Sequence, residues 1–295
     1  MEAVQLGLLI LAAVLLSSVI DQVVPKVSSP LIQIGLGVII ALLSESTIQI
    51  DIDANLFIVL FIVPLIYDES KSIDKTALWK NRRPVISLAI GLVLVAALAV
   101  GFYVHWLIPS MPLMAAFALG AALGPTDAVA VASLSKDINI KRQQKNVLEA
   151  ESLINDASGI VSFQFALAAV VTGAFSLLDA SVSFLFSFFG GILIGIVLGY
   201  LANFIIRRVR SLGLENTTFH VLFEVFTPFI VYLVANEFGT SGILAVVAAG
   251  LIGIISPRTM DPQVSRLNIV SSSVWKVLSF TLNGVVFVLL GAQLP

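Results

Sequence analysis

The chain has 295 residues, of which 58% are hydrophobic and only 12% are charged, about half the charged fraction of a soluble globular domain. This composition excludes an ordinary soluble domain. A mean hydropathy of +1.05, with apolar runs along the whole length, predicts an all-α polytopic membrane protein. The net charge of −2 is too small to favour a nucleic-acid partner. With no Cys and two His, Cys-type metal sites and disulfides are excluded, and we expect no bound cofactor.

The apolar runs predict about ten transmembrane helices. The first run has no basic segment before it and no small-residue cleavage site after it, so we interpret it as a span rather than a signal peptide. The predicted spans cover residues 3–20, 30–43, 55–67, 84–108, 113–135, 147–172, 183–206, 219–238, 240–255 and 274–292.

The basic residues predict the orientation of these spans. All sixteen Lys and Arg fall in or beside the connections after the first, third, fifth, seventh and ninth spans, and none falls in the other connections. Because basic loops stay in the cytoplasm, we expect these connections to be cytoplasmic and the N-terminus to lie outside. The simplest interpretation of each basic cluster is a solvated loop near anionic lipid.

The span at 113–135 contains a predicted helix break at Gly124–Asp127. Pro125 has no N–H to donate to the carbonyl four residues earlier, and its ring clashes with that carbonyl. Irregular backbone at this depth is tolerated only where protein or a water-filled cavity satisfies it. The freed carbonyls, the Thr126 hydroxyl and the Asp127 carboxylate would provide oxygen ligands for a hard monovalent cation. The alternative is a simple proline kink with a hydrogen-bonded Asp.

The span at 147–172 carries a polar stripe on one face. Its members follow helical spacing and form two adjacent rows: Glu151, Asn155, Ser158 and Ser162, then Ser152, Asp156 and Gly159. An ionised Asp at mid-bilayer costs about 2.5–3.5 kcal/mol, so such a residue usually marks an ion or substrate path. The small residues of this face would let the helix carrying Asp156 approach the break. A purely structural polar stripe is the alternative.

Other polar positions give weaker signals. Asp68 and Glu237 lie near span ends and are interpreted first as boundary charges, and His105 and His220 as interfacial residues rather than ligands. The row Gly191, Gly195 and Gly199 predicts close helix packing.

Four segments together resemble a known family. They are GPTDAVAV from Gly124, ESLINDASGIV from Glu151, SGILAVVAAGL from Ser241, and a looser FIVPLIYDES ending at Ser70. In this order and spacing the chain resembles the cation/proton antiporter superfamily, specifically its NhaP-like sodium/proton exchanger branch.

The resemblance implies roles for particular residues. Asp156, second in the Asn-Asp pair, corresponds to the carboxylate that takes either a proton or the monovalent cation. The positions around the ion site correspond to Thr126, Asp127, Glu151, Ser152 and Asn155. Asp68 falls where the family has an acidic residue on the path to the cytoplasm. Members with Asn first in the pair are usually electroneutral, so Asn155 favours one-for-one exchange.

The resemblance also implies an inverted-repeat fold of about thirteen spans and a homodimer in a bacterial cell membrane. Residues 1–67 and 219–292 would form the interface part, 84–172 the first half of the ion-binding core, and 183–206 a linking helix. A chain of ten spans would lack the last three, with their second broken helix and buried Arg. We therefore expect this sequence to be a fragment, or unable to transport alone.

The predicted function is exchange of protons for Na⁺, K⁺ or Li⁺ at Asp156, with no enzymatic activity, in contact with membrane lipid. Two alternatives remain open. An intramembrane aspartyl protease also uses two Asp on neighbouring spans, although this chain has GPTD in place of G-x-G-D. A passive cation channel would show uncoupled current. The sequence does not determine cation selectivity, which depends on cavity size and ligand number, nor transport direction or pH set point.

Overall fold

The computed structural model describes residues 2–24, 27–43, 53–126, 142–172, 177–214, 216–253 and 262–294, and every regular element in these ranges is a helix. The chain divides into two compact units. One comprises Met1–Leu65 with Arg258–Pro295, and the other comprises Ile66–Pro257.

The first unit is built on three helices: α1 (Glu2–Val23), α2 (Ser29–Leu43) and α14 (Pro262–Ala292). Helices α2 and α14 lie in close contact because each has a glycine that faces the backbone of the other helix. A Cβ on Gly37 would overlap the Val288 carbonyl, and one on Gly291 would overlap the Ile34 carbonyl. The same unit contains the short helix α3 (Ala54–Phe57), whose first turn is capped by the Asp53 carboxylate, and the π-helix η1 (Ile58–Ile62).

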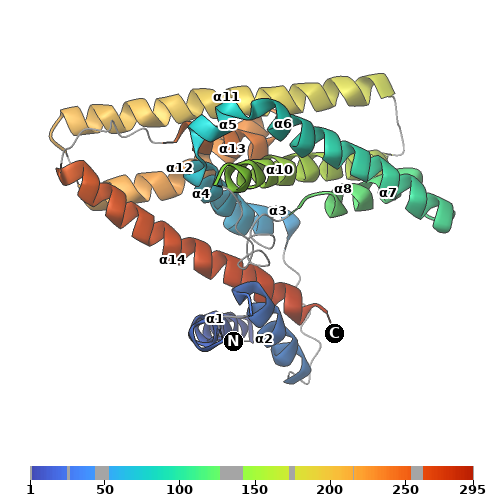
Figure 1. Ribbon diagram of the computed structural model, residues 1–295, viewed down its shortest axis with the longest axis horizontal. Helices are drawn as coiled ribbons and strands as arrows, with labels where there is room; N and C mark the ends of the chain where they lie inside the picture. Colours follow the sequence, from blue (N-terminus) through green and yellow to red (C-terminus); the bar gives the residue numbers. More distant parts are fainter. Residues whose placement is uncertain are drawn as a thin grey trace. The chain divides into compact units, whose positions relative to one another are not determined.

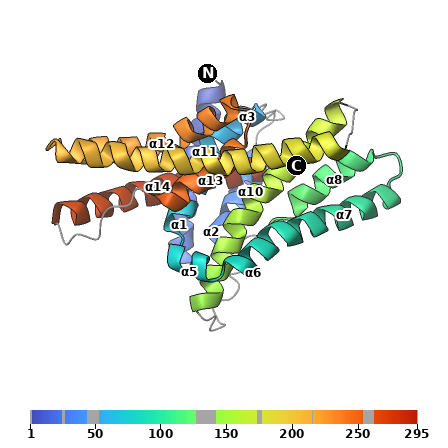
Figure 2. The ribbon, with the colours of Figure 1, turned by 90° about the horizontal axis from the view of Figure 1, so that it is seen from above.

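The second unit contains the remaining helices. In chain order they are α4 (Val63–Ser72), whose first turn belongs to the first unit, α5 (Lys75–Lys80), α6 (Arg82–Ile86), the π-helix η2 (Ser87–Leu92), α7 (Val93–Leu107), α8 (Leu113–Leu123), α10 (Arg142–Thr172), α11 (Leu177–Ser211), α12 (Thr217–Glu237) and α13 (Gly242–Ile252). Helices α7 and α8 run antiparallel to each other beside α10 (Figures 1 and 2).

Helix α13 forms the centre of the second unit. Every residue from Gly242 to Gly250 is buried, and α11 and α12 pack against it. The predicted packing role of the glycine row in α11 is confirmed, because a Cβ on Gly195 would overlap the Ala245 carbonyl. Small residues therefore meet small residues along the α11–α13 contact, which brings the two backbones together.

Each predicted span contains a described helix, but residues 127–135 and 254–255 of two spans lie outside the described residues. Six described helices are long and apolar enough to cross a membrane, and α2, α8 and α13 are shorter apolar helices. Large apolar side chains point outward, such as Leu15 at 71%, Trp106 at 75% and Val171 at 78% exposure. Such surfaces are rare on soluble monomers, so the chain is a membrane protein. The count of ten spans is not confirmed by these helices.

Two of the predicted spans are not regular α-helices. The 55–67 segment comprises α3, η1 and part of α4, and the 84–108 segment comprises η2 flanked by α6 and α7. In η1 the Val63 N–H donates to the Ile58 carbonyl, five residues back. Pro64 follows and has no N–H for an α-helical bond to the Leu60 carbonyl, which accounts for the wider turn.

Candidate polar site between helices α8 and α10

Helix α8 stops at the position that the sequence predicts. Its last residue is Leu123, and Gly124, Pro125 and Thr126 are not helical. The missing N–H of Pro125 explains why the α-helical ladder ends here. Asp127 and the rest of the predicted second half of this span lie outside the described residues.

Helix α10 approaches this chain end through a glycine. A Cβ on Gly159 would overlap the Pro125 ring and would lie 3.3 Å from the Ala121 carbonyl oxygen. Ala157 on the same helix is fully buried. At least one of the small residues predicted to permit a close approach, Gly159, is therefore at the contact.

The polar stripe of α10 is its packed face. Glu151, Ser152, Asn155 and Ser158 are all buried, whereas apolar residues farther along the helix, such as Val171, are exposed. This arrangement places polar groups against protein and apolar groups outward, as expected for a helix in lipid.

Four of the predicted site residues are joined by hydrogen bonds. The Asn155 amide nitrogen donates to Glu151 Oε1 at 2.7 Å and to Thr126 Oγ1 at 2.9 Å. The Thr126 hydroxyl lies 3.3 and 3.4 Å from the two Glu151 carboxylate oxygens, to which it donates. The Ser152 hydroxyl donates to the Thr126 carbonyl at 2.9 Å. The end of α8 and the polar face of α10 thus share one network.

One oxygen of this network has no donor among the described residues. The side-chain oxygen of Asn155 is buried and accepts no hydrogen bond from any residue in the described ranges. Leaving a buried acceptor unpaired costs about 1–3 kcal/mol. An amide oxygen in this position is a suitable ligand for a hard cation.

A further hydrogen bond attaches α10 to the π-helix η2. The Ser158 hydroxyl donates to the Ala89 carbonyl at 2.7 Å and to the Asn155 carbonyl at 3.0 Å. Both Ser158 and Ala89 are buried. The turn of α10 that carries Asn155 and Asp156 is therefore held by two neighbours, the end of α8 and η2.

Asp156 lies on α10 directly after Asn155 and is partly buried. It is one helical turn before Gly159, which contacts Pro125. Its carboxylate therefore projects from the segment of α10 that is packed against the end of α8.

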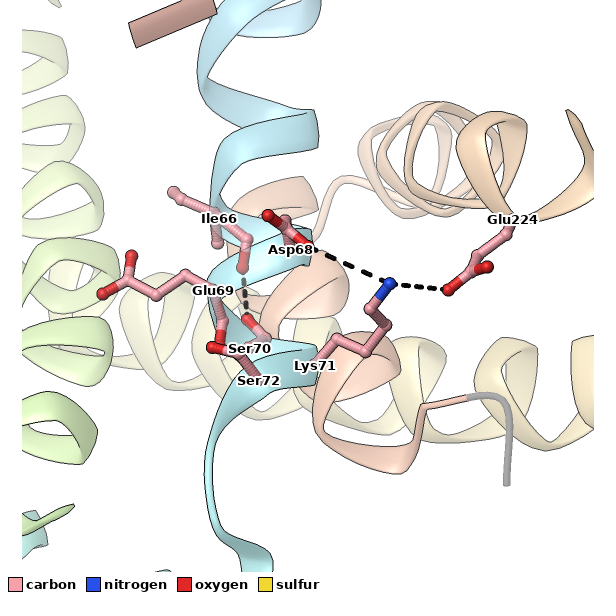
Figure 3. A network of polar contacts seen from close by, with 7 residues as sticks. All are labelled: Ile66, Asp68, Glu69, Ser70, Lys71, Ser72 and Glu224. Carbon is pink, nitrogen blue, oxygen red and sulfur yellow. Dashed lines mark hydrogen bonds and ion pairs between the residues drawn. The ribbon is translucent and has the colours of Figure 1, made fainter. Parts of the chain in front are cut away.

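The remaining predicted residue, Asp68, lies in a different polar cluster on α4. Its carboxylate is 3.9 Å from the Lys71 ammonium, which also donates to Glu224 on α12 at 2.7 Å. Figure 3 shows Lys71 between the two carboxylates, with Glu69 on the other side of α4.

Sequence reasoning missed Glu224 at this cluster. The signal that could have found it is an acidic residue in the middle of the 219–238 apolar segment, four residues after His220 and three before Thr227. All three are buried, so they form a polar face of α12 equivalent to that of α10. The described ranges contain no group of three His, Asp or Glu side chains placed to hold a metal ion.

Comparisons with known proteins identify the family of the chain. The sequence profile of the family described as "Sodium/hydrogen exchanger, transmembrane" matches residues 7–295. The chain is 46% identical over its whole length to a sodium, potassium, lithium and rubidium/H⁺ antiporter of Bacillus pumilus, of which it covers 44%. It is 43% identical over 98% of its length to the protein of the same description from Bacillus subtilis, of which it covers 43%.

The fold matches a solved structure. The sodium proton antiporter MjNhaP1 of Methanocaldococcus jannaschii superposes with a TM-score of 0.68 at 18% identity, covering 99% of this chain and 71% of that one. The chain spans less than half the length of the two Bacillus relatives. Because the family profile covers nearly the whole sequence, the chain belongs to the transmembrane sodium/hydrogen exchanger family.

Proposed function

We propose that the protein to which this chain belongs exchanges protons for monovalent cations across the cell membrane by alternating access at Asp156. The observation that carries the proposal is the network at the end of α8, in which Thr126, Glu151, Ser152 and Asn155 are hydrogen-bonded beside Asp156. The two Bacillus relatives are described as antiporters of sodium, potassium, lithium and rubidium, so the proposed cations are Na⁺, K⁺ and Li⁺.

Asp156 is the proposed carrier because of its charge and position. An ionised carboxylate within the membrane costs about 2.5–3.5 kcal/mol, and either a bound proton or a bound monovalent cation neutralises this charge. If the carrier reorients only when this carboxylate is neutralised, the flux of protons is coupled to the flux of cations in the opposite direction. Lower pH then favours the protonated form and reduces cation binding.

The neighbouring residues are proposed to provide cation ligands and to hold them in position. The Asn155 side-chain oxygen, which accepts no hydrogen bond from a described residue, supplies one oxygen ligand beside the Asp156 carboxylate. Glu151 fixes the Asn155 amide and the Thr126 hydroxyl through its hydrogen bonds. Asp127, in the adjoining sequence, is proposed to complete the site.

The proposed stoichiometry is one cation for one proton. Asn155 is not ionisable, so Asp156 is the single carboxylate of the pair that exchanges its neutralising ion. One-for-one exchange moves no net charge, and the membrane potential would not drive it.

The proposed organisation in the membrane follows the resemblance and the charge pattern. Residues 1–67 and 219–292 form the interface part of a homodimer, 84–172 the first half of the ion-binding core, and 183–206 the linking helix, within an inverted repeat of broken helices surrounded by lipid. The basic loops are cytoplasmic and the N-terminus is outside. Asp68 is proposed to lie on the cytoplasmic path to the site.

Protease and channel functions have less support. Membership of a family described as sodium/hydrogen exchangers favours coupled transport over peptide cleavage or passive conduction.

The test is cation-driven proton movement in vesicles containing the full-length protein. Addition of Na⁺ to acid-loaded vesicles should raise the internal pH, as reported by a trapped pH-sensitive dye. Asp156→Asn should abolish this signal. The control is Asp53→Asn, which makes the same substitution at the exposed N-cap of α3, where Asn caps as well as Asp. Exchange that persists unchanged in Asp156→Asn would reject Asp156 as the carrier.

A further inference from the structure

The ion pair between α4 and α12 has an asymmetric environment. The Glu224 side chain is 5% exposed, whereas the side chains of Lys71 and Asp68 are 24% and 26% exposed. The Lys71 ammonium lies 2.7 Å from Glu224 and 3.9 Å from Asp68 (Figure 3). Lys71 is therefore bound to a buried carboxylate and adjacent to a more accessible one.

The buried partner fixes the position of the ammonium. A buried carboxylate without an opposite charge is costly, and removing one member of a buried pair is far less favourable than keeping both. Glu224 therefore holds Lys71 in place, and Lys71 as a consequence keeps a positive charge beside Asp68.

This cluster lies at the end of α4 that the charge pattern places on the cytoplasmic side. The basic residues that follow Asp68 include Lys75, Lys80 and Arg82, and basic connections are cytoplasmic. Helix α5, which begins three residues after α4 ends, packs against α10, the helix that carries Asp156. A cation that approaches α10 from the cytoplasm therefore passes through the electrostatic field of this cluster.

We propose that the Lys71–Glu224 pair sets the apparent affinity for the cytoplasmic cation by fixing a tethered ammonium beside Asp68. Glu224 is thus a positioning residue that acts through Lys71. The inference rests on the proposed exchange function and on the cytoplasmic position of Asp68, and it concerns how strongly cations are attracted, not which residue carries them.

Two further ionisable groups in the described ranges, His220 and Tyr67, interact electrostatically with the pair. His220 lies one turn before Glu224 on α12 and is under the electrostatic influence of Glu224, Lys71 and Arg210 at the end of α11. The buried Tyr67 on α4 is influenced by Glu224. These groups are the same in all the variants below, so the differences among variants come from positions 71 and 224.

Removing the charge of Lys71 and removing that of Glu224 should shift the KM for cytoplasmic Na⁺ in opposite directions. Lys71→Gln removes a positive charge beside Asp68, so the KM for cytoplasmic Na⁺ should fall. Glu224→Gln removes the buried negative charge that offsets much of the ammonium's charge, so this KM should rise. The double variant Lys71→Gln/Glu224→Gln has the same net charge as the wild type and should have nearly its KM. Two unit charges about 4 Å apart in water interact strongly enough to change binding by about fivefold, which is the expected size of the Lys71→Gln shift. The Glu224→Gln shift should be smaller, because Lys71 lies between Glu224 and Asp68 (Figure 3).

The experiment measures exchange in vesicles at alkaline pH, where a carboxylate keeps its charge, with Na⁺ varied on the side that the cytoplasmic loops face. Lys71→Arg should match the wild type because it keeps the charge. Lys75→Gln is the control for loss of a nearby positive charge, since Lys75 instead donates to the Ile252 carbonyl. Glu237→Gln is the control for loss of an acidic residue elsewhere on α12, because Glu237 is the exposed last residue of this helix.

A pair that only stabilises the fold would give a different pattern. Both single variants would then lower protein yield and maximal rate together, with KM unchanged or shifted in the same direction, and this result would overturn the inference. If Lys71→Gln does not fold because Glu224 is left buried without an opposite charge, Glu224→Gln and the double variant still test the inference, because only Glu224→Gln should raise the KM. Loss of all exchange in the wild type would instead refute the proposed function.

Discussion

Replacing Gly159 with Ala tests whether the close approach of α10 to the end of α8 creates the polar site. The added Cβ would overlap the Pro125 ring, which cannot rotate away, and would lie 3.3 Å from the Ala121 carbonyl oxygen. Relieving the overlap requires the two segments to separate. That movement would stretch the hydrogen bonds that Thr126 receives from Ser152 and Asn155.

The expected loss of folding stability in Gly159→Ala is estimated from these contacts. Overpacking costs about 1–3 kcal/mol, and each of the two interhelical hydrogen bonds contributes about 0.6 kcal/mol in a membrane protein. The higher helix propensity of Ala returns about 0.5–1 kcal/mol. The net destabilisation should be about 1–4 kcal/mol, together with loss of cation exchange.

The assay is unfolding of the purified protein in detergent, combined with exchange in vesicles. Gly35→Ala is the matched control, because a Cβ on Gly35 in α2 meets no atom within 4 Å. It should leave exchange unchanged and should not destabilise. If Gly159→Ala were as stable and active as Gly35→Ala, the close contact would not be what forms the site.

Three further predictions concern neighbouring contacts. Asn155→Asp would place a second carboxylate where the amide nitrogen now donates to Glu151 Oε1 at 2.7 Å. Two ionised carboxylates this close repel each other, so the loss of stability relative to the wild type should be larger at alkaline than at acidic pH, and thermal unfolding at both would reveal this. A melting difference independent of pH would contradict it. Gly195→Ala should separate α11 from α13 at the Ala245 carbonyl and cost about 1–3 kcal/mol in detergent unfolding; an unchanged unfolding midpoint would show that the contact can relax. Ser158→Ala removes a hydrogen bond to η2 and should cost only about 0.6–1.7 kcal/mol while lowering the maximal exchange rate, and wild-type values for both would disprove its supporting role.

The positions of the helices and much of the polar site were predictable from the sequence. Apolar runs of the right length located the helices, and Pro125 marked the end of α8 because proline removes a backbone donor. Helical spacing placed Glu151 and Asn155 on one face, and the structure joins both to Thr126. These features depend on local chemistry, which a single sequence contains.

Contacts between distant segments were not predictable in the same way. The Lys71–Glu224 bond joins residues 153 positions apart, and neither residue alone indicates its partner. The Lys71 ammonium also lies 3.9 Å from the Asp68 carboxylate, a contact that the interpretation of Asp68 as a boundary charge neither required nor excluded. The π-helices η1 and η2 were likewise missed, because the hydrophobic pattern of a π-turn is too short to distinguish from that of an α-helix.

The polar faces of α10 and α12 show a common principle of membrane helices. Each buries acidic and other polar groups against protein, with Glu151 and Asn155 on α10 and His220 and Glu224 on α12. Because unpaired polar groups are costly in lipid, each face requires partners from another helix. The polar face of α10 is hydrogen-bonded to Thr126 at the end of α8. The polar face of α12 is paired with Lys71 of α4.

Competition between a proton and a cation for one carboxylate is tested most directly by proton release from the purified full-length protein. Na⁺ would be added in weakly buffered solution slightly below the pH at which exchange is fastest, and the released protons would be counted per protein. We predict saturable release of about one proton per cation bound, as a single exchanging carboxylate requires, in the wild type and in Asp53→Asn, and none in Asp156→Asn. Release of the same size in Asp156→Asn, or Na⁺ binding to the wild type without any release, would contradict the account.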